Sequence, residues 1–138
     1  MHELLGALRR VEDTAVRSID RVRRAWLVGR IRLLAAWRRT TVDLDIAPDL
    51  RVGRRVGVKV AARSHLRIRI APRCRIGDDV LLFLVAGSID WGEDVQLRVR
   101  SSLNLTGDLR CEGGNIFSYG TVIHCVESIR LGQWSGTA

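Results

Sequence analysis

Histidine and cysteine are the side chains that most readily carry proton transfer, nucleophilic attack or metal binding near neutral pH, and this sequence has three of each. His2 lies next to the N-terminus, and His65 stands among arginines in RSHLRIR, where a solvated surface role is expected. His124 stands in TVIHCVES, where its apolar neighbours Ile123 and Cys125 are predicted to hold the strand and its imidazole rigidly. His124 is therefore the candidate general base, and an exposed strand histidine without a chemical role is the alternative.

The three cysteines do not form a recognisable metal or redox motif. Cys74, Cys111 and Cys125 are separated by 37 and 14 positions, so neither a CxxC nor a CxxH pair occurs. An odd count with no secretory signal at the N-terminus indicates reduced thiols in a cytoplasmic protein. We therefore predict small buried core residues at these positions and no metal site.

The charge balance favours anionic partners. The net charge is +8 and the sequence isoelectric point is about 11.0, which suits nucleic acid, anionic lipid or phosphate-bearing ligands. No helix-turn-helix, zinc or aromatic stacking pattern is present, so nucleic acid is not the expected partner. The most apolar stretch, residues 25–37, has only 13 residues with two arginines among them, and is too short and too charged to span a bilayer.

Residues 3–39 have the periodicity of an amphipathic helix, and residues 1–41 are predicted to form a basic helical segment. Apolar residues recur at steps of three and four, and the helix holds ten arginines against four acids. Two interpretations remain open for its apolar stripe, which comprises Leu4, Leu8, Val11, Ala15, Ile19, Val22 and Trp26. The stripe either packs on the rest of the fold or lies on an anionic membrane surface.

After the helix the period changes to two, which is typical of strands with one buried face. From Ile46 to Ala86 the even positions are mostly apolar, and eight of the nine basic residues in this region stand at odd positions. From Ile89 onward the apolar positions are odd, so one extra residue must be absorbed near Gly87. Glu127 has inward parity in this second block and either lies at a corner or pairs with a neighbour.

Burial follows from the same parity. The residues predicted to be buried are Ile70, Ile76, Val99, Leu105, Ile123 and Ile129, and those predicted to be exposed are Arg67, Arg69, Arg98 and Arg100.

A six-residue recurrence accompanies the alternation. Residues 46–87 divide into IAPDLR, VGRRVG, VKVAAR, SHLRIR, IAPRCR, IGDDVL and LFLVAG, with an aliphatic first position in six of these seven hexads. The third position carries Pro48, Arg54, Pro72 and Asp78, which fit an inward parity only if the chain turns a corner there. A β-sandwich explains the alternation but not corners locked to this phase, so a solenoid is predicted for residues 42–138.

These hexads resemble those of the hexapeptide-repeat acyltransferases. VGRRV, IGDDV and LGQWS match the family pattern in phase, IAPRC nearly matches it, and the stretch from Asn115 to the end is similar to bacterial members. The resemblance covers residues 46–138 and implies an all-β solenoid, a left-handed parallel β-helix of about five 18-residue coils preceded by the amphipathic helix. It also implies a homotrimer with active sites between subunits.

The activity that the resemblance implies is transfer of an acyl group from a coenzyme A thioester, such as acetyl-CoA, to a hydroxyl or amine of a sugar or similar small acceptor. A histidine acts as general base in that family, and His124 is the residue here to which the role falls. The chain stops inside a repeat, so we expect a truncated acyltransferase with little activity alone, unless His124 is the base and activity is retained. The alternative function is a non-catalytic β-helix scaffold that oligomerises or attaches to the inner surface of an anionic membrane through residues 3–39.

Overall fold

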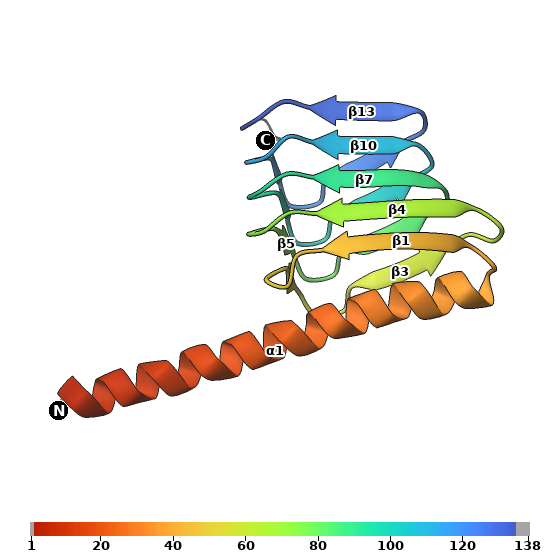
Figure 1. The fold of residues 1–138 in the computed structure, drawn as a ribbon. Coiled ribbons are helices and arrows are strands. Elements are labelled where there is room, and N and C mark those ends of the chain that lie inside the picture. The colour runs from red at the N-terminus through yellow and green to blue at the C-terminus, as the bar shows by residue number, and fades with distance from the viewer. Residues whose placement is uncertain (1, 135–138) are drawn as a thin grey trace.

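The computed structural model describes residues 2–134, in which a long helix precedes a parallel β-solenoid (Figure 1). The helix α1 spans His2–Trp37. Sheet A contains β1 (Thr41–Ile46), β4 (His65–Ile70), β7 (Gly87–Trp91), β10 (Asp108–Cys111) and β13 (Ser128–Leu131). Sheet B contains β2 (Arg51–Val52), β5 (Arg75–Ile76), β8 (Gln96–Leu97) and β11 (Ile116–Phe117). Sheet C contains β3 (Gly57–Val60), β6 (Leu81–Leu84), β9 (Ser102–Leu105) and β12 (Val122–Cys125).

Each coil contributes one strand to each sheet, and every pairing between neighbouring coils is parallel. The chain therefore makes about four coils, one fewer than the sequence pattern predicted. The coils are also longer than 18 residues. In sheet A, Leu66 pairs with Val42, 24 positions earlier, Ile89 pairs with Ile68, 21 earlier, and Leu109 pairs with Ile89, 20 earlier. The first spacing, 24 residues, equals four hexads. The six-residue recurrence therefore stays in phase from the first coil to the second, although each coil has only three faces.

The change of parity follows from these coil lengths. Spacings of 24 and 20 leave the parity of inward positions unchanged, whereas the single spacing of 21 reverses it between the second and third coils. The chain turns this corner at Gly87, whose φ of 98° lies in the left-handed region. A Cβ at Gly87 would lie 1.9 Å from the carbonyl oxygen of Gly107 in the next coil, so only glycine fits here. The predicted slip near residue 87 is confirmed.

The corners lie where proline and charge interrupted the inward parity. Pro48, Arg54, Pro72 and Asp78 all lie in turns, and the residues that follow Arg54, Pro72 and Asp78 have positive φ. In these turns Pro48, Arg54 and Pro72 are exposed and Asp78 is half-buried, at positions that would face inward within a strand. The corner interpretation of the third hexad position is therefore confirmed.

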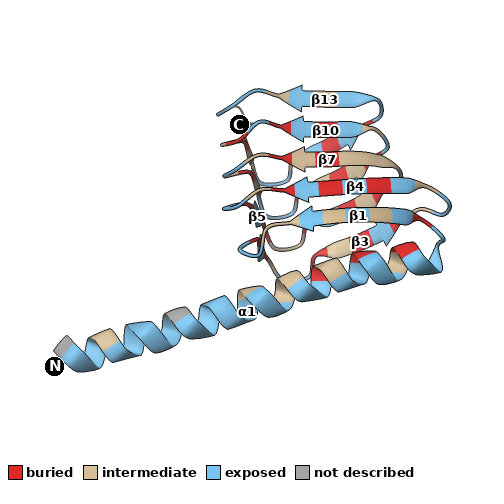
Figure 2. Cartoon of the chain, in the orientation of Figure 1, coloured by how far each residue is buried: buried red, intermediate tan, exposed pale blue. Residues whose placement is uncertain are grey.

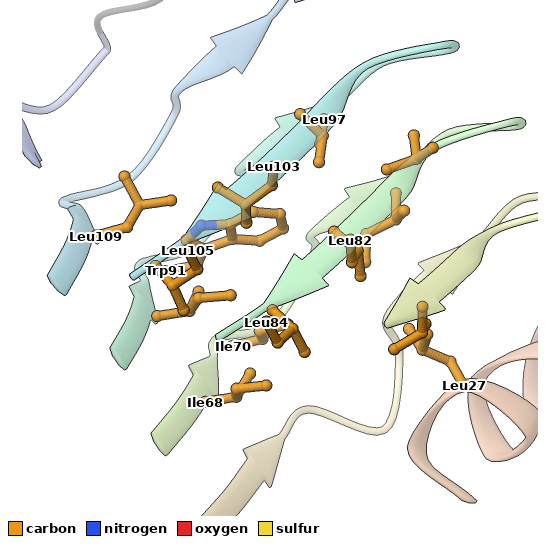
Figure 3. Packing of buried hydrophobic residues seen from close by; sticks show 14 of the residues in the cluster. Leu27, Ile68, Ile70, Leu82, Leu84, Trp91, Leu97, Leu103, Leu105 and Leu109 are labelled. Atoms are coloured by element: carbon orange, nitrogen blue, oxygen red, sulfur yellow. The ribbon is translucent and has the colours of Figure 1, made fainter. Parts of the chain in front are cut away.

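The core runs through the middle of the solenoid, between the three sheets (Figure 3). Ile70, Ile76, Leu105 and Ile123 are buried, and the four arginines predicted to be exposed are exposed. The prediction was wrong for Val99, which is 36% exposed because it lies in a turn, where strand parity no longer holds. It was also wrong for Ile129, which is half-buried because, within residues 2–134, β13 is the edge strand of sheet A and has a neighbour on one side only.

The C-terminal part of α1 covers the open end of the first coil. Leu27, Ile31 and Ala35 are buried in the common core, and the helix contacts β1, β2 and β3. Arg24 donates from Nε to the carbonyl of Ala47 at 2.9 Å and from Nη2 to the carbonyl of Ile46 at 2.6 Å. These carbonyls have no earlier coil to pair with, so the helix takes the place of a capping coil.

Candidate functional site

His124 lies on the outer face of sheet C, near the middle of β12. Because the strands are in register, one outward row runs through all four coils as Lys59, Phe83, Asn104 and His124. Ile123 and Cys125 on either side of His124 are buried and fix the strand, as the sequence predicted. The imidazole is therefore exposed on a rigid support, with the amide of Asn104 one strand away, at a strand spacing of about 4.8 Å.

A shallow groove of about 320 Å³ runs along this row. It is lined by Lys59, Leu81, Phe83, Ser102, Leu103, Asn104, Val122 and His124. Leu81 is 43% exposed and Val122 is 74% exposed, so the groove combines an apolar wall with a small number of polar groups. That composition is typical of sites that hold an apolar chain and orient a reactive group.

The groove contains one imidazole, that of His124. Among residues 2–134 no side chain hydrogen-bonds the His124 imidazole. Glu127, the nearest acid in the sequence, is exposed in the bend after β12, so the corner interpretation of Glu127 is correct. An exposed imidazole can still accept a proton from a substrate without a second side chain to orient it.

The other candidate residues lie elsewhere. His65 is exposed at the start of β4 on sheet A, in agreement with the surface role predicted for it, and the side chain of His2 falls outside the described part of the chain. The three cysteines are buried, as predicted. Burial raises the pKa of Cys74 and of Cys125, and raises that of Cys111 to about 12, so the thiols stay protonated and unreactive near neutral pH.

A second, larger cavity of about 510 Å³ lies between α1 and the outer face of sheet B. Its charged lining residues are Asp20, Arg23, Arg51, Arg75, Asp78 and Arg98. The sequence indicated basic outer strand faces, but it gave no sign that Arg23 of the helix would lie near three arginines of the sheet. That arrangement depends on the direction in which the helix leaves the first coil.

The helix α1 also has an unpartnered apolar face. Figure 2 shows that most of α1 is exposed and that its N-terminal half extends beyond the solenoid. All seven residues of the apolar stripe predicted from the sequence are exposed, so the packing interpretation of that stripe is wrong. The solenoid contacts a different stripe, which contains Leu27, Ile31, Leu34 and Ala35.

Comparisons with protein-family models, with curated proteins and with solved structures found no match. Within residues 2–134, no helix is both long enough and apolar enough to cross a membrane. The same residues contain no group of three or more histidine, cysteine, aspartate or glutamate side chains that could hold a metal ion.

Proposed function

We propose that this chain is a subunit of a coenzyme A-dependent acyltransferase of the hexapeptide-repeat type, in which His124 is the general base. The observation that carries the proposal is the exposed imidazole in an apolar groove on a rigid parallel β-solenoid. A groove walled by Leu81, Phe83 and Val122 suits the acyl group and the thioester arm of the donor. We also propose, from the same resemblance, that the coils wind in the left-handed sense.

In the proposed reaction, the imidazole of His124 accepts the proton of an acceptor hydroxyl or amine. The acceptor atom attacks the thioester carbonyl, the carbon–sulfur bond breaks, and the departing thiolate takes the proton back from the imidazolium. Asn104 and Ser102, on the neighbouring strand β9, are the groups nearest in register to donate to the carbonyl oxygen as negative charge develops on it. The acceptor is a sugar or similar small molecule, and acetyl-CoA is the simplest donor.

The groove is open along one side, which fits a site that is completed by a second copy of the chain. Exposed Leu81 and Val122 on sheet C supply an apolar surface for that contact, and a homotrimer is the assembly we propose. Residues from a neighbouring subunit would then cover the thioester and exclude water from it.

The test is thiol release from acetyl-CoA against a panel of sugars and amines. We expect turnover by the full chain and a loss of about 10²-fold or more in His124→Ala, because general-base catalysis typically contributes about 10²–10⁴-fold. The matched control is His65→Ala, which removes another exposed strand histidine. Equal rates in His124→Ala and His65→Ala would reject His124 as the base.

A second candidate function is attachment of the solenoid to an anionic membrane as a scaffold, and α1 favours it. At about 100° per residue, an arc of about 120° along the whole helix carries no charged side chain. The exposed large apolar residues in this arc are Leu4, Leu8, Val11, Ile19, Val22, Trp26, Leu33 and Trp37. The centre of the arc is roughly 165° around the helix from the packed stripe, so the face points away from the solenoid.

The charges beside this arc match an anionic surface. Arg10, Arg17, Arg21 and Arg32 lie along one border of the arc together with Glu3, and Arg23 and Arg30 lie along the other together with Glu12. Basic residues therefore outnumber acids by six to two along these borders. Each basic residue near an anionic bilayer contributes on the order of 1 kcal/mol to binding. The helix would lie flat at the inner membrane surface, with the solenoid standing on its other side.

A flotation assay with anionic and neutral vesicles tests this function. We expect binding to anionic vesicles that weakens with salt and is reduced several-fold in Val11→Asp, which places a charge in the apolar arc. Val16→Asp is the matched control, because Val16 is exposed on the side of the helix that faces the solenoid cavity. Equal binding to neutral and anionic vesicles, or equal loss in both variants, would reject the membrane role.

A further inference from the structure

The cavity between α1 and sheet B concentrates positive charge in one place. Arg51 of β2 and Arg75 of β5 are direct neighbours in the parallel register, and Arg98 follows β8 in the next coil. Arg23 of α1 faces the same cavity from the helix side. Two acids share the lining, Asp20 and Asp78, so four guanidinium groups meet two carboxylates.

The two carboxylates neutralise little of this charge. The only ion pair that Asp20 makes within residues 2–134 is with Arg51, at the long distance of 3.9 Å. Asp78 directs Oδ1 to the backbone amide of Arg54 at 2.8 Å and is occupied in shaping a corner. No carboxylate whose side chain the structure describes forms an ion pair with Arg23, Arg75 or Arg98.

Elsewhere on the solenoid, four arginines are matched by acids in neighbouring coils. Arg55 pairs with Asp79 at 2.8 Å, Arg73 with Asp94 at 3.1 Å, and Arg69 with Asp45 at 4.0 Å. Arg130 pairs in the same way with Glu112. Arg110 and Arg130 are also direct neighbours in register, but Arg130 there is paired with Glu112. In the stack of Arg51 on Arg75, Arg51 has only the long contact with Asp20, although like charges in adjacent strand positions destabilise a sheet.

An anion in the cavity would remove that repulsion. Guanidinium groups bind phosphoryl oxygens through paired, charge-assisted hydrogen bonds. Arg51 and Arg75 stand about 4.8 Å apart along the solenoid axis, so one arginine can hold each phosphoryl group of a diphosphate. A volume of about 510 Å³ leaves room for the group that such a diphosphate carries.

We propose that this cleft binds a ligand with two adjacent phosphoryl groups, held by Arg23, Arg51, Arg75 and Arg98. The ligand is either a soluble diphosphate ester, such as a nucleoside diphosphate, or the diphosphate headgroup of a lipid, because the recognising chemistry is the same. The proposal does not depend on acyl transfer, since the cleft lies on sheet B and His124 lies on sheet C. His124→Ala is therefore expected to bind the ligand as well as the unmodified chain does.

The experiment measures binding and thermal unfolding of the full chain with inorganic pyrophosphate, ADP, sulfate, and vesicles that contain a lipid diphosphate. Arg75→Gln is the test variant, and Arg67→Gln is the matched control, because Arg67 is also an exposed strand arginine of the second coil. We expect Arg75→Gln to weaken pyrophosphate or ADP binding about tenfold or more and Arg67→Gln to change it less than twofold. Binding of the soluble probes identifies a soluble ester as the ligand, and binding of the lipid vesicles alone identifies a headgroup.

Thermal unfolding separates a binding site from a merely structural arginine. Without ligand, Arg75→Gln should raise Tm by roughly 1–3 °C, since it removes a like-charge neighbour. With pyrophosphate at a hundredfold excess over its Kd, the unmodified chain should gain roughly 5 °C or more and the variant should gain much less. Equal losses of affinity in the two variants, equal response to sulfate and pyrophosphate, or no binding of any probe would each overturn the proposal.

Discussion

Replacing Ile76 with alanine tests how tightly the coils pack. Ile76 is 2% exposed in β5, and its neighbours in register are Val52 in the coil before and Leu97 in the coil after, both buried. Substitutions of buried isoleucine by alanine cost about 2–5 kcal/mol, depending on how far the site collapses. Here the backbone ladders fix both neighbours, so little collapse is possible and a cost of about 3–5 kcal/mol is expected.

Urea unfolding followed by far-UV circular dichroism measures this cost. With an m-value of about 2 kcal/mol/M, the expected loss lowers the midpoint by about 1.5–2.5 M. Val126→Ala, in the bend after β12, is the control, because its side chain is 60% exposed and its loss should change the free energy of unfolding by less than about 0.5 kcal/mol. A loss below about 1 kcal/mol in Ile76→Ala, or one equal to that of the control, would refute the close packing of successive coils.

Three further predictions concern the corners, the helix cap and the thiols. Gly107→Ala should lower stability by about 1–3 kcal/mol, because its Cβ would lie 2.1 Å from a backbone carbonyl oxygen of the next coil. Gly29→Ala has open space around the new Cβ and should raise stability by up to about 1 kcal/mol, since alanine favours the helix. Thermal melts of both variants test this pair. Arg24→Gln should cost about 1–3 kcal/mol, measured by urea unfolding, because the carbonyls of Ile46 and Ala47 at the end of β1 lose their charged donor. Burial raises the pKa of Cys111 from its ordinary value to about 12, so the contribution of this thiol to stability is complete below pH 9 and falls as pH rises from there. The difference in the free energy of unfolding between the unmodified chain and Cys111→Ala should therefore shrink between about pH 9 and 11. A difference that stays constant over this range would contradict burial as the cause of the shift.

The solenoid was predictable from the sequence because its rules are local. Alternation fixes which side chains face inward, and proline or charge at an inward position marks a corner, as Pro72 and Asp78 do. The reversal of parity at Gly87 was readable for the same reason. Coil length was not readable, because a corner can hold extra residues without disturbing the alternation on either side of it, and Val99 was misplaced for that reason.

The candidate sites were predictable only in part. The outward direction of His124 followed from strand parity, but its groove depends on which residues the register places beside it, such as Phe83 and Asn104. Asn104 precedes His124 by 20 positions and Phe83 precedes it by 41. Because the coils differ in length, no fixed spacing in the sequence shows that these residues lie in one row. The arginine cavity depends on the path of α1 relative to sheet B, which no local pattern encodes.

The most direct test of the central claim is covalent labelling with bromoacetyl-coenzyme A, followed by mass spectrometry of the peptides. The bromoacetyl group reacts with a nucleophile that lies where the acyl group binds, and the buried cysteines offer little competition for it. If the groove on sheet C is the acyl-transfer site, the label appears on His124 and acetyl-CoA protects against it. Labelling of His65 to the same extent, or labelling of His124 that acetyl-CoA does not reduce, would contradict the assignment.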